Sequence, residues 1–177
     1  MSVTAFNVVN EPVAREFEEL FNEHYPLVYR TAYSVTGNIQ DAEDVVQTVF
    51  LRLLRRGVPV RFRENPRGYL YRAAINVSLN TIRSQKRHVL TGDEGRLDRP
   101  VEEDNTEPDP LQGLLPGALA RLSPRSIEML ILRYQHRYTE AQIGNLLGTS
   151  RGVVAVTLFR ARARLKKLLR ASSGGKS

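Results

Sequence analysis

Apolar side chains in the first half of the chain recur at the three- and four-residue spacing of one face of an α-helix. Helix-breaking residues interrupt this repeat at 36–38 (Thr-Gly-Asn) and 57–59 (Gly-Val-Pro). A third helix is expected to start with Asn65 as its N-cap and Pro66 at its first position, where the missing N–H costs nothing. The helices predicted from this pattern span 14–35, 39–56 and 66–87.

The amino-acid composition changes between residues 92 and 117, a segment that is rich in Gly, Pro, Asp and Glu and poor in apolar side chains. Such a segment cannot bury enough apolar surface to offset its ordering entropy, so it is predicted to be flexible. Four further helices are predicted at 114–122, 124–134, 139–147 and 150–170. The predicted fold class is all-α, with two small helical domains joined by a flexible acidic linker. The expected parts are an N-terminal tail (1–13), a first domain (14–90), the linker (91–113), a second domain (114–170) and a C-terminal tail (171–177).

The net charge of +7 is strongly segregated along the chain. Residues 52–87 carry +9 and residues 121–177 carry +10, whereas residues 1–51 and 91–110 carry −6 each. Lys and Arg neutralise phosphates and release counterions, so two basic blocks indicate two places that meet a polyanion. The opposite charges and the flexible tether are compatible with a closed arrangement of the two domains, but the sequence leaves open whether the domains pack together.

The segment from 139 to 169 has the pattern of a helix-turn-helix. Thr139 and Gln142 can form a capping box, and Gly148 can take the left-handed conformation that ends the first helix. Gly144 supplies a small residue where two steeply crossing helices meet. An ordinary helical hairpin is the competing interpretation.

The composition of the second helix favours DNA binding over the hairpin. Its later turns carry only basic charges, and no acidic residue follows Glu140. The second helix of this motif presents its N-terminal residues to base edges, and later cations meet phosphates. The candidate DNA contacts are Ser150, Arg151, Gly152, Ala155, Thr157, Arg160 and Arg162.

Two polar surfaces are predicted in the first domain. Asp41, Asp44 and Thr48 share a helical face, with Gln47 beside Asp44. This ridge could be a metal-carboxylate cluster with Glu43, but helix N-terminal charge and a protein partner are the favoured interpretation.

The other surface lies within residues 61–87, where arginines interleave with Phe62, Tyr69 and Tyr71. Aromatic faces can stack on unpaired bases while cations follow the backbone. The competing interpretation is that these tyrosines belong to the core.

Other classes of protein fit the composition poorly. The chain has no cysteine, and His24, His88 and His136 lack ligand spacing, so neither a disulfide framework nor a metal or other cofactor is expected. No run approaches the roughly 20 apolar residues of a membrane span, which predicts no membrane insertion and a cytoplasmic location.

Together these motifs resemble the sigma-70 family of RNA polymerase sigma factors, in its compact extracytoplasmic-function (ECF) group. The resemblance covers nearly the whole chain. It is carried by TGNIQDAEDVVQTVFLRLLR (36–55), NPRGYLYRAAINVSLNTIRSQKR (65–87), LARLSPRSIEMLILRYQHRYTEAQIGNLLG (119–148) and LFRARARL (158–165).

The resemblance implies a non-enzymatic specificity subunit that directs the RNA polymerase core to promoters and assists their melting. Asp41, Asp44 and Gln47 would bind a coiled coil of the polymerase large subunit. The helix-turn-helix would read the −35 element of promoter DNA, and the linker would thread polymerase channels. An anti-sigma factor is a further candidate partner, because one is common in this group. Candidate −10 contacts are Arg61, Arg63, Asn76, Asn80 and Arg83.

The sequence departs from the family pattern most clearly in the recognition helix. Where Gly-Thr-Val-Lys-Ser-Arg is common, this chain has Gly-Val-Val-Ala-Val-Thr at 152–157. A bidentate base contact contributes roughly 1–3 kcal/mol of discrimination, so losing the Lys and Arg should weaken or redirect sequence reading. Milder departures are Thr48 and Tyr69.

Two other functions are possible from the residues alone. A transcriptional regulator could use the helix-turn-helix without polymerase, although the acidic ridge would then have no role. A metal-dependent nuclease could use Asp41, Glu43 and Asp44, but no second carboxylate or histidine cluster supports it.

Overall fold

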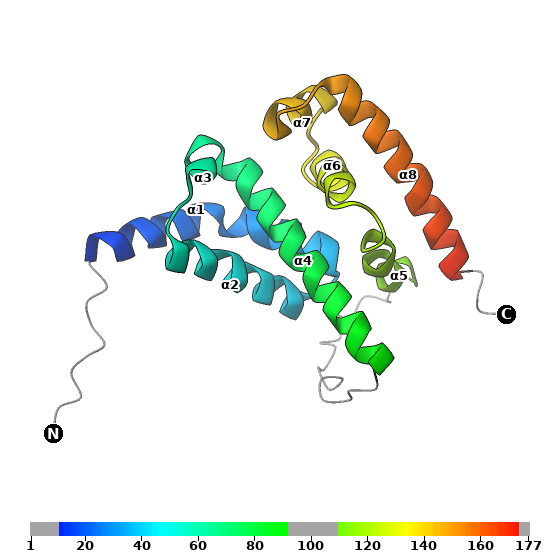
Figure 1. Ribbon diagram of the computed structural model, residues 1–177, viewed down its shortest axis with the longest axis horizontal. Helices are drawn as coiled ribbons and strands as arrows, with labels where there is room; N and C mark the ends of the chain where they lie inside the picture. The colour runs from blue at the N-terminus through cyan, green and yellow to red at the C-terminus, as the bar shows by residue number, and fades with distance from the viewer. Residues whose placement is uncertain (1–10, 92–109, 174–177) are drawn as a thin grey trace.

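The computed structural model describes residues 11–91 and 110–173, which form eight helices and no strand (Figure 1). The all-α prediction is therefore confirmed. The predicted flexible linker lies mostly at 92–109, outside the described residues. The helices are α1 (Glu11–Thr36), α2 (Ile39–Arg56), α3 (Val60–Glu64), α4 (Pro66–Thr91), α5 (Pro110–Leu119), α6 (Pro124–Tyr134), α7 (Glu140–Leu147) and α8 (Arg151–Ser173).

Helices α1 to α4 pack around one apolar core. Asn38 begins α2 by accepting a hydrogen bond from the backbone N–H of Asp41 at 2.8 Å, as an N-cap does. Asn65 caps α4 in the same way, through the N–H of Gly68 at 2.9 Å, which confirms its predicted role. The buried side chains of this core include Val28, Ala32, Ala42, Val45, Val46, Val49, Phe50, Leu53, Phe62, Leu70, Ala74 and Val77.

Two elements differ from the sequence predictions. Helix α3 occupies a segment where only a break was expected, because Phe62 folds back into the core and is 6% exposed. Helix α5 begins at Pro110, inside the segment predicted as linker. Its leucines contribute Leu115 and Leu119 to the core shared with α6 and α8, which explains why this stretch orders.

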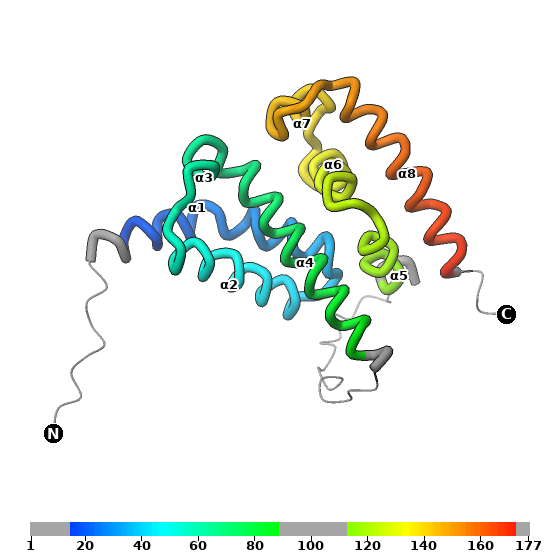
Figure 2. The backbone as a smooth tube through the Cα atoms, in the orientation of Figure 1, coloured from blue at the N-terminus to red at the C-terminus, as the bar shows by residue number. Residues whose placement is uncertain are grey.

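The two halves of the chain share a second core. Tyr71, Ile75, Leu79 and Ile82 project from α4 and join the buried side chains of the C-terminal helices. In Figure 2, α6 lies between α4 and α8, so α4 is covered by α1 and α2 on one side and by the C-terminal half on the other. The structure is therefore closed, and the shared apolar core decides a question that the sequence left open.

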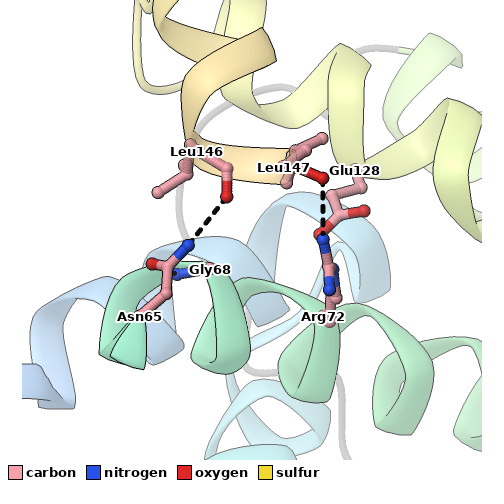
Figure 3. A network of polar contacts seen from close by, with 6 residues as sticks. All are labelled: Asn65, Gly68, Arg72, Glu128, Leu146 and Leu147. Carbon is pink, nitrogen blue, oxygen red and sulfur yellow. Dashed lines mark hydrogen bonds and ion pairs between the residues drawn. The ribbon is translucent and has the colours of Figure 1, made fainter. Parts of the chain in front are cut away.

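Polar contacts reinforce this closed arrangement at the end of α7 (Figure 3). Asn65 donates through Nδ2 to the carbonyl oxygen of Leu146 at 2.8 Å, and Arg72 donates through Nη2 to that of Leu147 at 3.2 Å. Arg72 Nε also pairs with Glu128 Oε1 at 3.2 Å. The last carbonyls of a helix lack intrahelical partners, so the first half of the chain satisfies groups that the second half leaves open.

Desolvation dominates the electrostatics of this ion pair. Burial raises the pKa of Glu128 above its ordinary value, although Arg72 and Arg125 act in the opposite direction. The ion pair therefore compensates the Glu128 carboxylate only in part for the hydration that it loses on burial. Removing Arg72 would leave the Glu128 carboxylate buried with less compensation.

The closed arrangement should weaken on mild acidification because of His136. Its ring packs edge-on against that of Tyr71, with the ring centroids 4.9 Å apart. Its Nε2 lies 3.3 Å from the Thr31 hydroxyl oxygen. Burial lowers the pKa of His136, and the positive charges of Arg30 and Arg67 lower it further. The neutral imidazole is therefore favoured in the closed state. The contribution of neutral His136 to the free energy of unfolding is complete above the ordinary pKa of about 6.5. It falls as pH drops below that value, by at most about 1.4 kcal/mol per pH unit.

Thermal unfolding and small-angle scattering between pH 7.5 and 5 would measure this effect. The variant His136→Gln stays neutral, so it should lose the part of the pH dependence that wild type shows below pH 6.5. Identical pH profiles for the two proteins would assign the dependence to other groups.

Candidate nucleic-acid and polymerase interfaces

Helices α7 and α8 form a helix-turn-helix. Thr139 and Gln142 make both hydrogen bonds of a capping box, and Gly148 ends α7 with φ 65° and ψ 44°, in the left-handed region. Ser150 then caps α8 by accepting from the N–H of Val153 at 3.3 Å. Ile143, Leu147, Val154 and Leu158 are buried between the helices. These features confirm the local geometry predicted from the sequence.

Gly144 controls how closely the turn approaches α7. A Cβ at this position would lie 2.7 Å from the backbone oxygen of Thr149, whereas a Cβ at Gly152 would meet nothing closer than 4.0 Å. We expect Gly144→Ala to lower the free energy of unfolding by about 1–3 kcal/mol, the usual cost of overpacking. Gly152→Ala is the matched control and should leave stability unchanged or slightly higher, because alanine favours helix.

Thermal and urea unfolding of both variants would test this difference. Equal stabilities for the two alanine variants would show that the turn relaxes freely around Gly144.

The predicted −35 contacts divide between different sides of α8. Ser150, Arg151, Gly152 and Arg160 are exposed, whereas Ala155 and Thr157 are half-buried. Arg151 Nε lies 3.7 Å from Glu140 Oε2, so an acidic residue of α7 positions its guanidinium. Arg162 is also exposed and donates to the Tyr134 hydroxyl at 3.2 Å. Arg160 therefore faces solvent with the exposed side of the helix, and Arg162 lies toward α6.

The predicted −10 contacts occupy two separate sites. Arg61 and Arg63 are exposed on α3, at the N-terminal end of α4. Asn76, Asn80 and Arg83 are exposed along the middle and later turns of α4. Arg83 Nη2 donates to the Ala120 carbonyl oxygen at 3.3 Å, so the closed arrangement already engages one of these candidates.

The aromatic residues of this region belong mainly to the core. Tyr71 is fully buried, and Phe62 packs edge-on against Tyr69 with ring centroids 5.7 Å apart. The suggestion that Phe62 and Tyr71 stack on unpaired bases is therefore wrong for this conformation. Only Tyr69, which is half-buried, keeps part of its ring accessible.

The exposed face of α2 differs from the predicted acidic ridge, because Asp41 is buried and does not belong to it. Asp41 is 4% exposed, and its carboxylate accepts from Asn38 at 2.7 Å and from Gln85 of α4 at 2.9 and 3.0 Å. Its role here is to bind α4. Asp44 and Gln47 are exposed, as a docking surface requires.

Two leucines extend this exposed face and were missed. Leu51 and Leu54 are 44% and 46% exposed, and they continue from Asp44 and Gln47 at helical spacing. Apolar periodicity alone does not separate Leu54 from the buried Leu53. The spacing 44, 47, 51, 54 was the available signal, because it marks a second stripe, polar at one end and apolar at the other, beside the core stripe. We call these four residues the α2 stripe.

The carboxylates of α2 do not form a metal site. The carboxylate of Asp41 accepts hydrogen bonds from Asn38 and Gln85. Glu43 lies near Tyr29: burial raises the pKa of Tyr29 most, and Tyr25 and then Glu43 raise it further. Within residues 11–91 and 110–173 no group of three acidic, histidine or cysteine side chains could hold a metal ion. The nuclease interpretation therefore lacks a site in this part of the chain.

These features define a helical, DNA-binding protein that has a second exposed face of mixed polarity. A helix-turn-helix carries a basic second helix, and the other half of the chain exposes the α2 stripe. Two family models match the chain: Sigma-70 region 2, over residues 20–88, and Sigma-70 region 4, over residues 112–165. The chain therefore belongs to the sigma-70 family, as an ECF RNA polymerase sigma factor.

Curated relatives agree with this assignment. The chain is 29% identical over 154 residues to the RNA polymerase sigma-E factor of Streptomyces antibioticus, covering 87% of this chain and 84% of that protein. It is 31% identical over 163 residues to the ECF RNA polymerase sigma factor SigE of Mycolicibacterium smegmatis, covering 86% and 61% respectively.

A solved structure supports the fold. The sigma factor RpoE from Bartonella quintana, crystallised with the anti-sigma factor NepR, superposes with a TM-score of 0.50 at 21% identity, covering 88% of this chain and 98% of that one.

The protein therefore directs RNA polymerase to promoters for transcription initiation. The interpretation as a DNA-binding regulator that works without polymerase is not favoured, because both family models and the curated relatives are those of sigma factors. Sigma factors are non-enzymatic initiation factors. None of the described helices is long and apolar enough to cross a membrane.

Proposed function

We propose that the two halves of the chain divide the work of a sigma factor. The α2 stripe binds a coiled coil of the polymerase large subunit, with Asp44 and Gln47 as its polar end and Leu51 and Leu54 as its apolar end. Asp41 contributes indirectly, because it holds α4 beside α2. The observation that carries this proposal is one exposed, mixed polar and apolar face on a helix whose opposite face is fully buried.

Promoter DNA is contacted by the basic surfaces. Arg61, Arg63, Asn76, Asn80 and Arg83 serve the −10 element, and their exposure supports this role. The N-terminal turns of α8 enter the major groove at the −35 element, with Arg160 on the phosphates. The acidic segment 91–110 follows polymerase channels made for nucleic acid.

The chain contributes no chemistry of its own in this scheme. The polymerase performs phosphoryl transfer, and the sigma factor supplies binding free energy that offsets part of the unstacking cost of melting. We place this work in the cytoplasm, with the polymerase core and promoter DNA as partners. An anti-sigma factor is a further partner, by analogy with the Bartonella complex.

The deciding experiment mixes the purified full chain with core polymerase and a promoter library, and measures co-purification and transcript start sites. We expect a stable complex and transcription from a subset of promoters that core alone ignores. Failure to co-purify with core would overturn the proposal, whereas DNA binding without core would favour the regulator.

A further inference from the structure

The recognition helix exposes apolar side chains where base-reading residues are expected. Val153, Val156 and Phe159 are 45%, 49% and 67% exposed. The opposite face of α8 is buried through Val154, Leu158, Ala161 and Leu168. Packing within the described chain therefore does not account for these three side chains.

Val156 lies near the centre of the exposed face. At 100° per residue, Val153 and Arg160 flank it one turn away in each direction. Gly152 lies on the same side, and a Cβ there would meet nothing closer than 4.0 Å, so the backbone can be approached closely. The first two turns thus form an apolar patch beside which the basic part of the helix begins.

The charge of α8 and its place as the second helix of a helix-turn-helix indicate duplex DNA as the occupant of this patch. The helix contains no acidic residue, and six cations follow the patch along its later turns. Such a helix is attracted to phosphates. The cations are Arg160, Arg162, Arg164, Lys166, Lys167 and Arg170.

An apolar patch can recognise only one feature of the major groove. Thymine carries a 5-methyl group there beside its O4 acceptor, whereas guanine, adenine and cytosine present only polar acceptors or donors. Valine cannot hydrogen-bond to those polar edges, and covering them without a partner costs free energy. We propose that Val153 and Val156 read thymine 5-methyl groups in the upstream promoter element. This inference rests on the proposed placement of α8 in the major groove.

Replacing thymine by uracil tests the inference directly, because it removes the methyl group and keeps the base pair. The upstream element is first selected with the complex of core polymerase and full chain on a randomised duplex library. Each thymine of the selected element is then replaced by uracil, one at a time. We expect about a fourfold loss of affinity at one or two positions, the value of one buried methyl-sized group.

The variants Val153→Ala and Val156→Ala should bind the thymine duplex more weakly and lose the thymine-to-uracil difference at the position each one contacts. Arg160→Ala is the matched control: it should weaken both duplexes equally and flatten the salt dependence, as a phosphate contact does. Co-purification with core checks that each variant still forms the complex.

Two results would overturn the inference. One is equal affinity for thymine and uracil duplexes at every position in wild type. The other is a thymine-to-uracil difference that both valine variants retain. In either case the complex still binds the upstream duplex, so the placement of α8 survives. A complex that ignores the upstream duplex altogether would instead overturn that placement and the inference with it.

Discussion

Replacing Asp44 by Arg is expected to abolish binding of core RNA polymerase while leaving the fold intact. Asp44 is exposed near the start of α2, at the polar end of the α2 stripe. Reversing its charge places a cation against a surface that accepts a carboxylate, and like-charge contacts in interfaces cost several kcal/mol. The expected loss of affinity is about 100-fold or more, since 1.4 kcal/mol is a factor of ten.

Two further variants show whether the effect belongs to the α2 stripe. Glu43→Arg makes the same charge change one residue away, on the side near Tyr29, and should reduce core binding far less. Leu51→Ala should leave stability unchanged, because Leu51 is exposed and not part of the core. It should weaken core binding by about tenfold, because truncating a side chain that anchors an interface costs more than about 1 kcal/mol of binding free energy.

Pull-down with core polymerase and circular dichroism melts measure the two properties separately. Duplex binding by the Asp44→Arg chain should match wild type. Equal losses for Asp44→Arg and Glu43→Arg would show that net charge, not the stripe, controls the affinity.

Replacing Arg72 by Glu is expected to shift the protein toward an open arrangement of its two halves. The change removes the hydrogen bond to the Leu147 carbonyl oxygen and places a second carboxylate beside the buried Glu128. It also brings negative charge to the C-terminal end of α7, where the helix dipole is negative. Leaving such groups unsatisfied costs about 1–3 kcal/mol, so the closed population should fall by roughly 10- to 100-fold relative to the open one.

Small-angle scattering of the full chain measures this opening as an increase in the radius of gyration. Asn76→Glu is the matched control, because it adds the same carboxylate one turn further along α4 at an exposed position. The double variant Arg72→Glu with Glu128→Arg should recover part of the compact form. An unchanged radius of gyration for Arg72→Glu would show that the apolar contacts alone hold the halves together.

Opening is expected to release cations that the closed form engages. In the closed form Arg83 donates to the Ala120 carbonyl oxygen and Lys86 Nζ to that of Gly117 at 3.3 Å. These cations lie along the surface proposed for the −10 element. We therefore expect the separated protein to present a more complete basic surface to promoter DNA than the closed one.

Local sequence rules predicted the helix ends well because their causes are local. Asn65, Thr139 and Gly148 act on backbone groups within four residues, and the structure has each of them in its predicted role. Helix α3 was missed for the opposite reason: five residues have no periodicity to detect, and the helix forms because Phe62 finds a place in a core built by distant segments.

The candidate sites show the same division. Periodicity assigned Asp41 to the ridge with Asp44, but the carboxylate of Asp41 faces Gln85, which is 44 residues away in sequence. Leu54 and Leu53 are adjacent and chemically identical, yet only Leu53 is buried. A helical pattern gives the angle between side chains, and it does not give the direction of the neighbouring helix.

The sequence by itself therefore determined the all-α class, the helix-turn-helix, the segregated charge and the resemblance to sigma factors, because these follow from short-range backbone chemistry and residue order. Only the tertiary structure decided which face of each helix packs against other helices and which face remains exposed. It buried Asp41 and Tyr71, exposed Leu51 and Val156, and joined Arg72 to the end of α7, because burial depends on contacts between residues far apart in the chain.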